Sequence, residues 1–161
     1  MTDGSDFDRQ APVINETPVP HHCFGCGALN ASGLKLRFRR LTDGGVWAEF
    51  TPDRRFEGYL GMVHGGVLAT MLDEAMSWAI TASGDFAVTA RMNTAFRSPA
   101  MVGRPLRVEG RVVSERRRLV DTSARIVDSE SGELLAEAEA VFMRVSAEQT
   151  ADWRAAYLGE S

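Results

Sequence analysis

The chain has 161 residues, of which 44% are hydrophobic, and this suits one domain with a single apolar core rather than two domains. Its formal net charge of −4 gives no overall basic field for nucleic acid. No apolar run reaches the ~20 residues that span a bilayer, and the start, MTDGSDFDRQ, has no apolar signal core. We therefore expect a cytoplasmic protein without nucleic-acid or membrane partners, with a flexible arm at residues 1–20 and a single domain at residues 21–161.

The first predicted elements are two short strands. Leu34, Leu36 and Phe38 alternate with basic residues, which is typical of a half-buried strand. The residues DGG at 43–45 are a hairpin signal, and residues 46–51 form the predicted return strand. The pattern predicts an antiparallel hairpin at the start of the domain.

One long helix is predicted from about Gly65 to Ala82. Gly84 follows it, at a position where a glycine commonly ends a helix. The apolar residues recur every three or four positions, as on the buried face of an amphipathic helix; they are Val67, Leu68, Met71, Leu72, Ala75, Met76 and Ile80.

Four strands follow the helix, and a short helix at about 151–158 ends the chain. The strands are predicted at residues 86–97, 105–115, 119–128 and 134–145. Sequential strands with short turns favour an antiparallel sheet, and a single apolar helix must pack on one face of it. The predicted class is α+β, with an antiparallel sheet of five to six strands and one central helix.

The start of the long helix carries unusual residues. His64 is followed by Gly65 and Gly66, and Asp73 lies nine residues after the histidine. Free N–H groups at a helix N-terminus can stabilise an oxyanion, and glycine lets a ligand approach the backbone. A carboxylate on an apolar helix face is costly to bury unless it is paired or used. In the alternative interpretation, the glycines serve only helix–sheet packing, His64 is a bonded core histidine, Asp73 pairs with an arginine, and Glu74 is solvated.

Three stretches resemble a known family. FEGYLGMVHGGVLATMLDEAMSWAI (56–80) and VTARMNTAFRSPA (88–100) resemble the PaaI-type acyl-CoA thioesterases of the hotdog fold, and HHCFGCGALNASGLKLRF (21–38) resembles the leader of one branch of that family. The resemblance implies that the sheet wraps around the helix. It also implies hydrolysis of an acyl-CoA to free acid and CoA, without a metal or an organic cofactor.

The resemblance also implies roles for individual residues. Gly65 N–H would be the main oxyanion donor, and His64 would orient the site or the thioester. Asp73 matches the catalytic acid position, as general base or nucleophile. Thr89, on the following strand, would hold the attacking water or the acid, although a β-branched residue is also ordinary in a strand.

Substrate-binding candidates surround these residues. Gly66 continues the helix start, and Gly58 lies in the EGY loop, where some relatives have an Asn or Gln that contacts the thioester. Asn93 lies four residues after Thr89 and is expected to face the same side of the strand. Arg97 is a candidate for the CoA phosphates because its guanidinium offers a fork of donors. Arg104 and the run ERRR at 115–118 are alternatives, and a solvated turn is the usual fate of such a run.

The spacing of His64 and Asp73 predicts a second chain. Residues nine apart in a helix are separated by about 13.5 Å along the axis and by about 180° around it. They cannot converge on one carbonyl, whereas two antiparallel copies of the helix bring Gly65 of one near Asp73 of the other. We expect an isologous homodimer with two shared sites, which could pair again as a dimer of dimers.

The cysteine-containing leader does not predict a metal site. Cys23 and Cys26 form a single C-x-x-C, no second ligand pair follows, and the third histidine of the chain, His64, has another role. A glycine-rich turn over the pocket mouth is the preferred interpretation.

Two other functions remain open. A hotdog hydratase would need a His with an acid placed for proton abstraction, which the H-G-G helix start argues against. A non-catalytic acyl-CoA sensor would need an output module, and no DNA-binding helix pair precedes residue 34.

Overall fold

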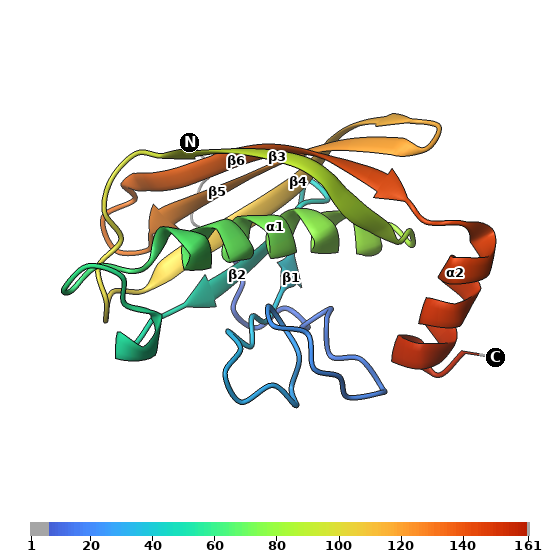
Figure 1. The fold of residues 1–161 in the computed structure, drawn as a ribbon, viewed down its shortest axis with the longest axis horizontal. Coiled ribbons are helices and arrows are strands. Elements are labelled where there is room, and N and C mark those ends of the chain that lie inside the picture. Colours follow the sequence, from blue (N-terminus) through green and yellow to red (C-terminus); the bar gives the residue numbers. More distant parts are fainter. Residues whose placement is uncertain (1–6, 161) are drawn as a thin grey trace.

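A six-stranded antiparallel sheet curves around one long helix in the computed structural model, which describes residues 7–160 (Figure 1). The strands are β1 (Arg39–Arg40), β2 (Val46–Phe50), β3 (Ala87–Phe96), β4 (Leu106–Arg116), β5 (Leu119–Asp128) and β6 (Leu134–Arg144). The helices are α1 (Gly65–Thr81) and α2 (Ala147–Trp153), with a 3-10 turn at Arg54–Phe56 and a π turn at Arg154–Leu158. The strand order β1-β2-β4-β5-β6-β3 makes β3 an edge strand. The predicted class and strand number are confirmed.

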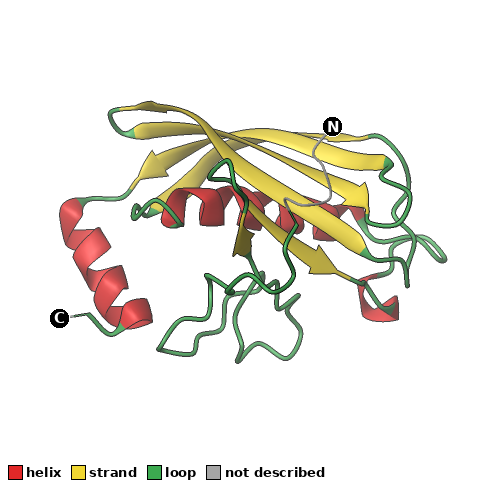
Figure 2. Cartoon of the chain, turned by 180° about the vertical axis from the view of Figure 1, so that it is seen from behind, coloured by secondary structure: helices red, strands yellow, loops and turns green. Residues whose placement is uncertain are grey.

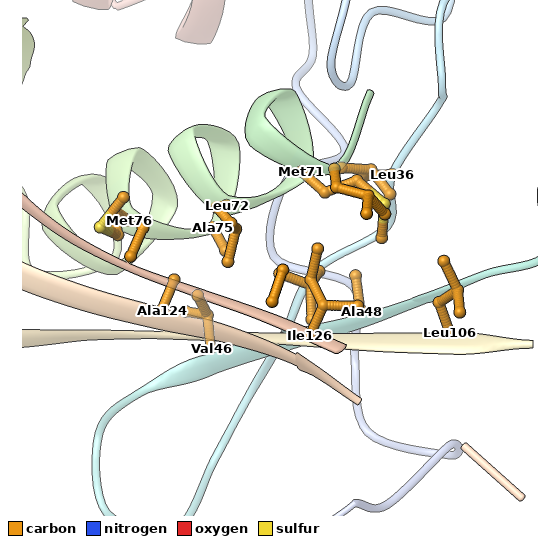
Figure 3. Packing of buried hydrophobic residues seen from close by; sticks show 14 of the residues in the cluster. Leu36, Val46, Ala48, Met71, Leu72, Ala75, Met76, Leu106, Ala124 and Ile126 are labelled. Carbon is orange, nitrogen blue, oxygen red and sulfur yellow. The ribbon is translucent and has the colours of Figure 1, made fainter. Parts of the chain in front are cut away.

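Helix α1 packs its apolar face on the sheet, as its periodicity predicts. Figure 3 shows Leu72 and Ala75 pointing toward side chains of the strands, and Met71 beside Leu36, which precedes β1. The helix lies close over Gly110 of β4, where a Cβ would clash with the carbonyl of Ala75. This close packing fixes α1 across the sheet and therefore fixes where both of its ends lie.

The segment before β1 differs from the prediction. Leu34, Leu36 and Phe38 are buried, as expected, but the segment is not a strand. The N–H groups of Leu34 and Leu36 donate to the carbonyls of Phe24 and Gly25, in the loop at residues 21–33, which is called the leader from here on. The alternation therefore reflects burial beneath the leader, and only the two residues of β1 pair with β2.

The N-terminal segment is described from Phe7, and residues 1–6 of the predicted arm lie outside the described part. Phe7 stacks edge-on against Trp47. Asn15 is only 6% exposed; its side chain donates to the carbonyl of Leu36 and accepts from the N–H of Phe38. The division of the chain at residue 20 stays a prediction.

The C-terminal helix begins earlier than predicted. Ser146 caps α2 by accepting from the N–H of Gln149, so the helix starts at Ala147 rather than near residue 151. Figures 1 and 2 both place α2 and the leader loops on the side of α1 away from β3, β5 and β6. Within residues 7–160, every helix is too short or too polar to cross a membrane.

Candidate active site

His64 is the N-cap of α1. Its backbone is extended (φ −60°, ψ 133°), and its Nδ1 accepts from the N–H of Gly66 at 2.9 Å. This cap explains how a helix can begin with two glycines. Because Nδ1 is an acceptor here, the neutral imidazole carries its proton on Nε2. Gly58 packs against this residue, since a Cβ at Gly58 would lie 3.0 Å from the Cα of His64.

The N–H of Gly65 is the free donor at this helix start. Val67 and Leu68 donate to the carbonyl of His64, and Gly66 donates to its ring, whereas Gly65 N–H has no acceptor in the described part of the chain. A cavity of about 700 Å³ opens beside it, lined by residues that include His64, Gly65 and Phe96. The helix start therefore offers an unsatisfied donor to a ligand-sized space.

Packing within one protomer does not require glycine at position 65. A Cβ there would lie 3.5 Å from the ring of Phe96, an ordinary contact. At Gly66, in contrast, a Cβ would lie 3.0 Å from the Nδ1 of His64 and would disturb the cap. The interpretation that both glycines serve helix–sheet packing therefore fails, since neither Cβ would meet the core of the sheet.

Asp73 is bonded to the strand that follows the helix. The hydroxyl of Thr89 on β3 donates to Asp73 Oδ1 at 2.6 Å. No arginine forms an ion pair with this carboxylate in the structure from residue 7 to residue 160, so the predicted alternative of an Asp73–arginine pair is wrong. Asp73 and Thr89, to which the family resemblance gave roles at the attacking water, therefore lie in direct contact.

The helix start and the Asp73–Thr89 pair are separate within one protomer. The cavity at the helix start does not include Asp73 or Thr89 in its lining, as the helical distance of about 13.5 Å requires. Edge strand β3 runs from Thr89, at the pair, to Phe96, beside Gly65, and it exposes Val88 (48%) and Phe96 (56%).

Asn93 does not share a face with Thr89, which corrects the prediction. A bulge between Thr89 and Arg91 inserts one residue, and this reverses the alternation of the strand. Thr89 pairs with buried Phe142, on the side of the sheet that faces α1, whereas Asn93 pairs with exposed Glu139. Asn93 therefore lies on the outer face of the sheet, away from Asp73.

Comparisons with known proteins identify the family. The sequence model described as thioesterase superfamily matches residues 60–135. Human acyl-coenzyme A thioesterase 13 is 28% identical over 105 residues, which cover 64% of this chain and 75% of the human protein. A solved thioesterase superfamily protein has a TM-score of 0.72 at 29% identity, over 76% of this chain and 60% of that one. The matched segment, residues 60–135, belongs to the thioesterase superfamily.

The subtype and fold agree with the sequence resemblance. The PaaI protein of E. coli superposes with a TM-score of 0.65 at 19% identity, over 70% of this chain and 81% of that one, which supports the fold. The predicted PaaI-type hotdog thioesterase, and with it the class of thioester hydrolase, is confirmed.

Two of the arginines that are candidates for binding the CoA phosphates already pair with carboxylates in this thioesterase. Arg97 lines the cavity, and its side chain pairs with Glu137 at 2.6 Å. Arg104 pairs with Asp128 at 2.6 Å. At the tip between β4 and β5, Arg117 has a left-handed backbone (φ 42°). The assignment of Arg97 to the CoA phosphates stays a prediction, and such a role would require it to exchange Glu137 for phosphate.

Glu74 is not solvated, so this part of the alternative interpretation is also wrong. It does not point into solvent: its carboxylate accepts from the indole N–H of Trp78 at 3.2 Å and lies 3.7 Å from the thiol of Cys23. Burial raises the pKa of Glu74 to about 7. The thiol of Cys26 donates to Cys23 and lowers the pKa of Cys23 to about 5, and the same bond raises the pKa of Cys26. The two thiols and the carboxylate form one cluster.

Proposed function

We propose that this thioesterase hydrolyses acyl-CoA to the free acid and CoA in a site that two protomers build together. The observation that carries the proposal is the free N–H of Gly65, which faces a cavity of about 700 Å³ at the start of a 17-residue helix. The substrate class rests on the name of the human relative, acyl-coenzyme A thioesterase 13.

Gly65 and His64 act on the carbonyl oxygen of the thioester. As water attacks, negative charge develops on that oxygen, and a fixed N–H at a helix N-terminus stabilises it. His64 keeps its Nδ1 bonded to the N–H of Gly66. Its Nε2–H is therefore a second donor for the thioester, and the helix cap fixes the orientation of the ring.

Asp73 acts on the attacking nucleophile. With Oδ1 bound by Thr89, Oδ2 takes a proton from water as the water oxygen bonds to the carbonyl carbon. The tetrahedral intermediate then expels the CoA sulfur, which takes up the proton, so the products are the acid and the CoA thiol. Direct attack by Asp73 would instead give an anhydride. A single turnover in ¹⁸O-water separates the two routes, because only the anhydride route can leave ¹⁸O in Asp73.

A second protomer would bring the oxyanion donor of one chain close to the base of the other. Strand β3 is an edge strand with exposed apolar side chains, and such an edge favours pairing with another chain. Tyr59 (86% exposed) and Leu60 (85% exposed) add apolar surface beside the cavity. An isologous pair with antiparallel copies of α1 would bring Gly65 of one protomer to Asp73 of the other.

Mixed dimers test the shared site. Gly65→Pro removes one N–H at the first helical position, where proline is tolerated, and Asp73→Asn removes the base. Each homodimer should be inactive, whereas a heterodimer keeps one intact site. After subunit exchange, an equal mixture should regain about a quarter of wild-type activity, because half of the dimers carry one site of two. Heterodimers that form without regaining activity would contradict the proposal.

A further inference from the structure

A second cavity lies beside the C-terminal half of α1. It has a volume of about 340 Å³, is open to solvent, and is bordered by the leader, α1, the start of β3 and the C-terminal helical segment. Aromatic side chains of Trp78, Trp153 and Tyr157 form part of its wall, and Cys23, Cys26, Glu74 and His21 line it as well. Neither Asp73 nor the helix start borders it, so this cavity is separate from the proposed thioesterase site.

The ligand atoms of Cys23, Cys26 and Glu74 are already close enough to share an ion. One atom from each lies within 4.8 Å of the others, and Cys23 Sγ lies 3.7 and 3.8 Å from the two carboxylate oxygens of Glu74. In tetrahedral zinc sites, metal–sulfur bonds of about 2.3 Å and metal–oxygen bonds of about 2.0 Å place such ligand atoms about 3.5 Å apart. Closing this cluster around an ion would therefore require shifts of less than ~1.5 Å.

The leader turn is shaped to present the two thiols. The N–H of Gly27 donates to the carbonyl of Cys23 at 2.8 Å, and a Cβ at Gly27 would clash with the backbone of Cys23. At Gly25, a Cβ would lie 2.5 Å from the carboxyl carbon of Glu74. Glycine at position 25 leaves room for the carboxylate of Glu74 against the C-x-x-C turn, and a larger residue would displace it.

The turn is also held in place from outside. Two backbone bonds tie it to the buried segment after it, from Leu34 to Phe24 and from Leu36 to Gly25. A site that is positioned before the ion arrives loses less conformational freedom on binding. The sequence argument against a metal rested on the lack of further ligands, and α1 supplies one from 48 residues along the chain.

We propose that Cys23, Cys26 and Glu74 bind one zinc ion, with the fourth position open to the cavity. Two thiolates and a carboxylate suit Zn²⁺, whereas Ca²⁺ and Mg²⁺ need oxygen ligands throughout. A closed structural site has four protein ligands, and three protein ligands with an open position leave room for water or an exogenous ligand. The bound ion would also tie the leader to α1. The proposal is independent of thioester hydrolysis.

Metal titration of the full chain, purified without a histidine tag, tests this site. The protein is stripped with a chelator under reducing conditions, loaded with Zn²⁺, desalted, and analysed for metal by mass spectrometry. We expect one zinc per chain, and with Co²⁺ we expect the thiolate-to-metal charge-transfer absorption of a tetrahedral site. Cys23→Ser and Cys26→Ser should each abolish this absorption, and Glu74→Gln should weaken zinc binding at least tenfold.

Asp73→Asn is the matched control, because it changes the neighbouring acid on the same helix, which is bonded to Thr89. It should keep full metal binding. Circular dichroism of each metal-free variant checks that the domain is folded. Failure of the reduced wild-type protein to bind zinc would overturn the proposal, as would unchanged binding in folded Cys23→Ser. If the thiols are isolated as a disulfide and the reduced form still binds no metal, the pair is not a metal site.

Discussion

The hydroxyl of Thr89 donates to Oδ1 of Asp73 at 2.6 Å, so the edge strand β3 orients the carboxylate of helix α1. A hydrogen bond to a charged group contributes ~1.5–3 kcal/mol. If this bond orients the base, Thr89→Val should lower kcat by about tenfold to a hundredfold, and Thr89→Ser should keep most of the activity. Steady-state kinetics with one acyl-CoA measure this. Equal kcat values for the two variants would show that the hydroxyl has no role in turnover.

His64 has a capping role that can be separated from its proposed catalytic role. His64→Ala removes the acceptor for the N–H of Gly66, so we expect it to lower the free energy of unfolding by about 1 kcal/mol and also to lower kcat. His64→Asn keeps a capping acceptor but loses the Nε2–H donor. It should regain the stability without regaining the activity, as measured by urea denaturation and by kinetics. Recovery of both stability and activity in His64→Asn would show that His64 acts only as a helix cap.

Gly65→Ala separates ligand approach from packing. The added Cβ meets only the ring of Phe96, at 3.5 Å, and alanine favours a helix over glycine by up to ~1 kcal/mol. We expect an unchanged or higher melting temperature. The same methyl group intrudes on the cavity, so kcat/KM should fall by roughly tenfold to a hundredfold. A variant that is as active as the wild type would show that the thioester does not approach this backbone.

Asp128 makes the free energy of unfolding depend on pH in the acidic range. Its carboxylate accepts from Arg104 and from the N–H groups of Glu130 and Ser131, and the Arg104 guanidinium holds its pKa well below the usual range. As the pH falls, the carboxylate of Asp128 therefore takes up a proton at about pH 3.9 in the unfolded chain (its usual pKa), and only at a lower pH in the folded protein. The stabilisation is complete above the unfolded pKa and is lost as the pH falls through the folded pKa.

Asp128→Asn should consequently lower the denaturation midpoint at pH 7 but have a smaller effect at pH 3 and below. Urea titrations at several pH values measure the difference. Glu130→Gln is the control, since its exposed side chain pairs with the same arginine at 3.2 Å, and it should change the midpoint little at any pH. A difference between wild type and Asp128→Asn that stays constant with pH would contradict the role of the charge.

Much of the fold follows from local patterns in the sequence. The α1 helix matches its prediction within one residue at its C-terminal end because three- and four-residue spacing of apolar side chains creates a buried face that only a helix can present. Strands β4, β5 and β6 likewise follow from alternation. The segment at Leu34–Phe38 alternates for a different reason, burial beneath the leader, and a pattern of burial cannot report which backbone groups pair.

The long-range relations required the tertiary structure. Asn93 was assigned to the wrong face because one extra residue at the bulge after Thr89 reverses the alternation, and no local signal marks that residue. Helical geometry predicts that Asp73 and Glu74 point about 100° apart, but it does not report what packs on Glu74, which only the alternative interpretation placed in solvent. The leader covers it with two cysteines.

By itself, the sequence determined the helix, most of the strands, the family resemblance and the separation of Gly65 from Asp73 along one helix, because each depends on residues close together in the chain or on fixed helical geometry. Only the tertiary structure decided that Thr89 bonds to Asp73 and that Glu74 meets Cys23 and Cys26. These contacts join residues 16 to 51 positions apart, and their geometry is set by how α1, β3 and the leader pack on one another.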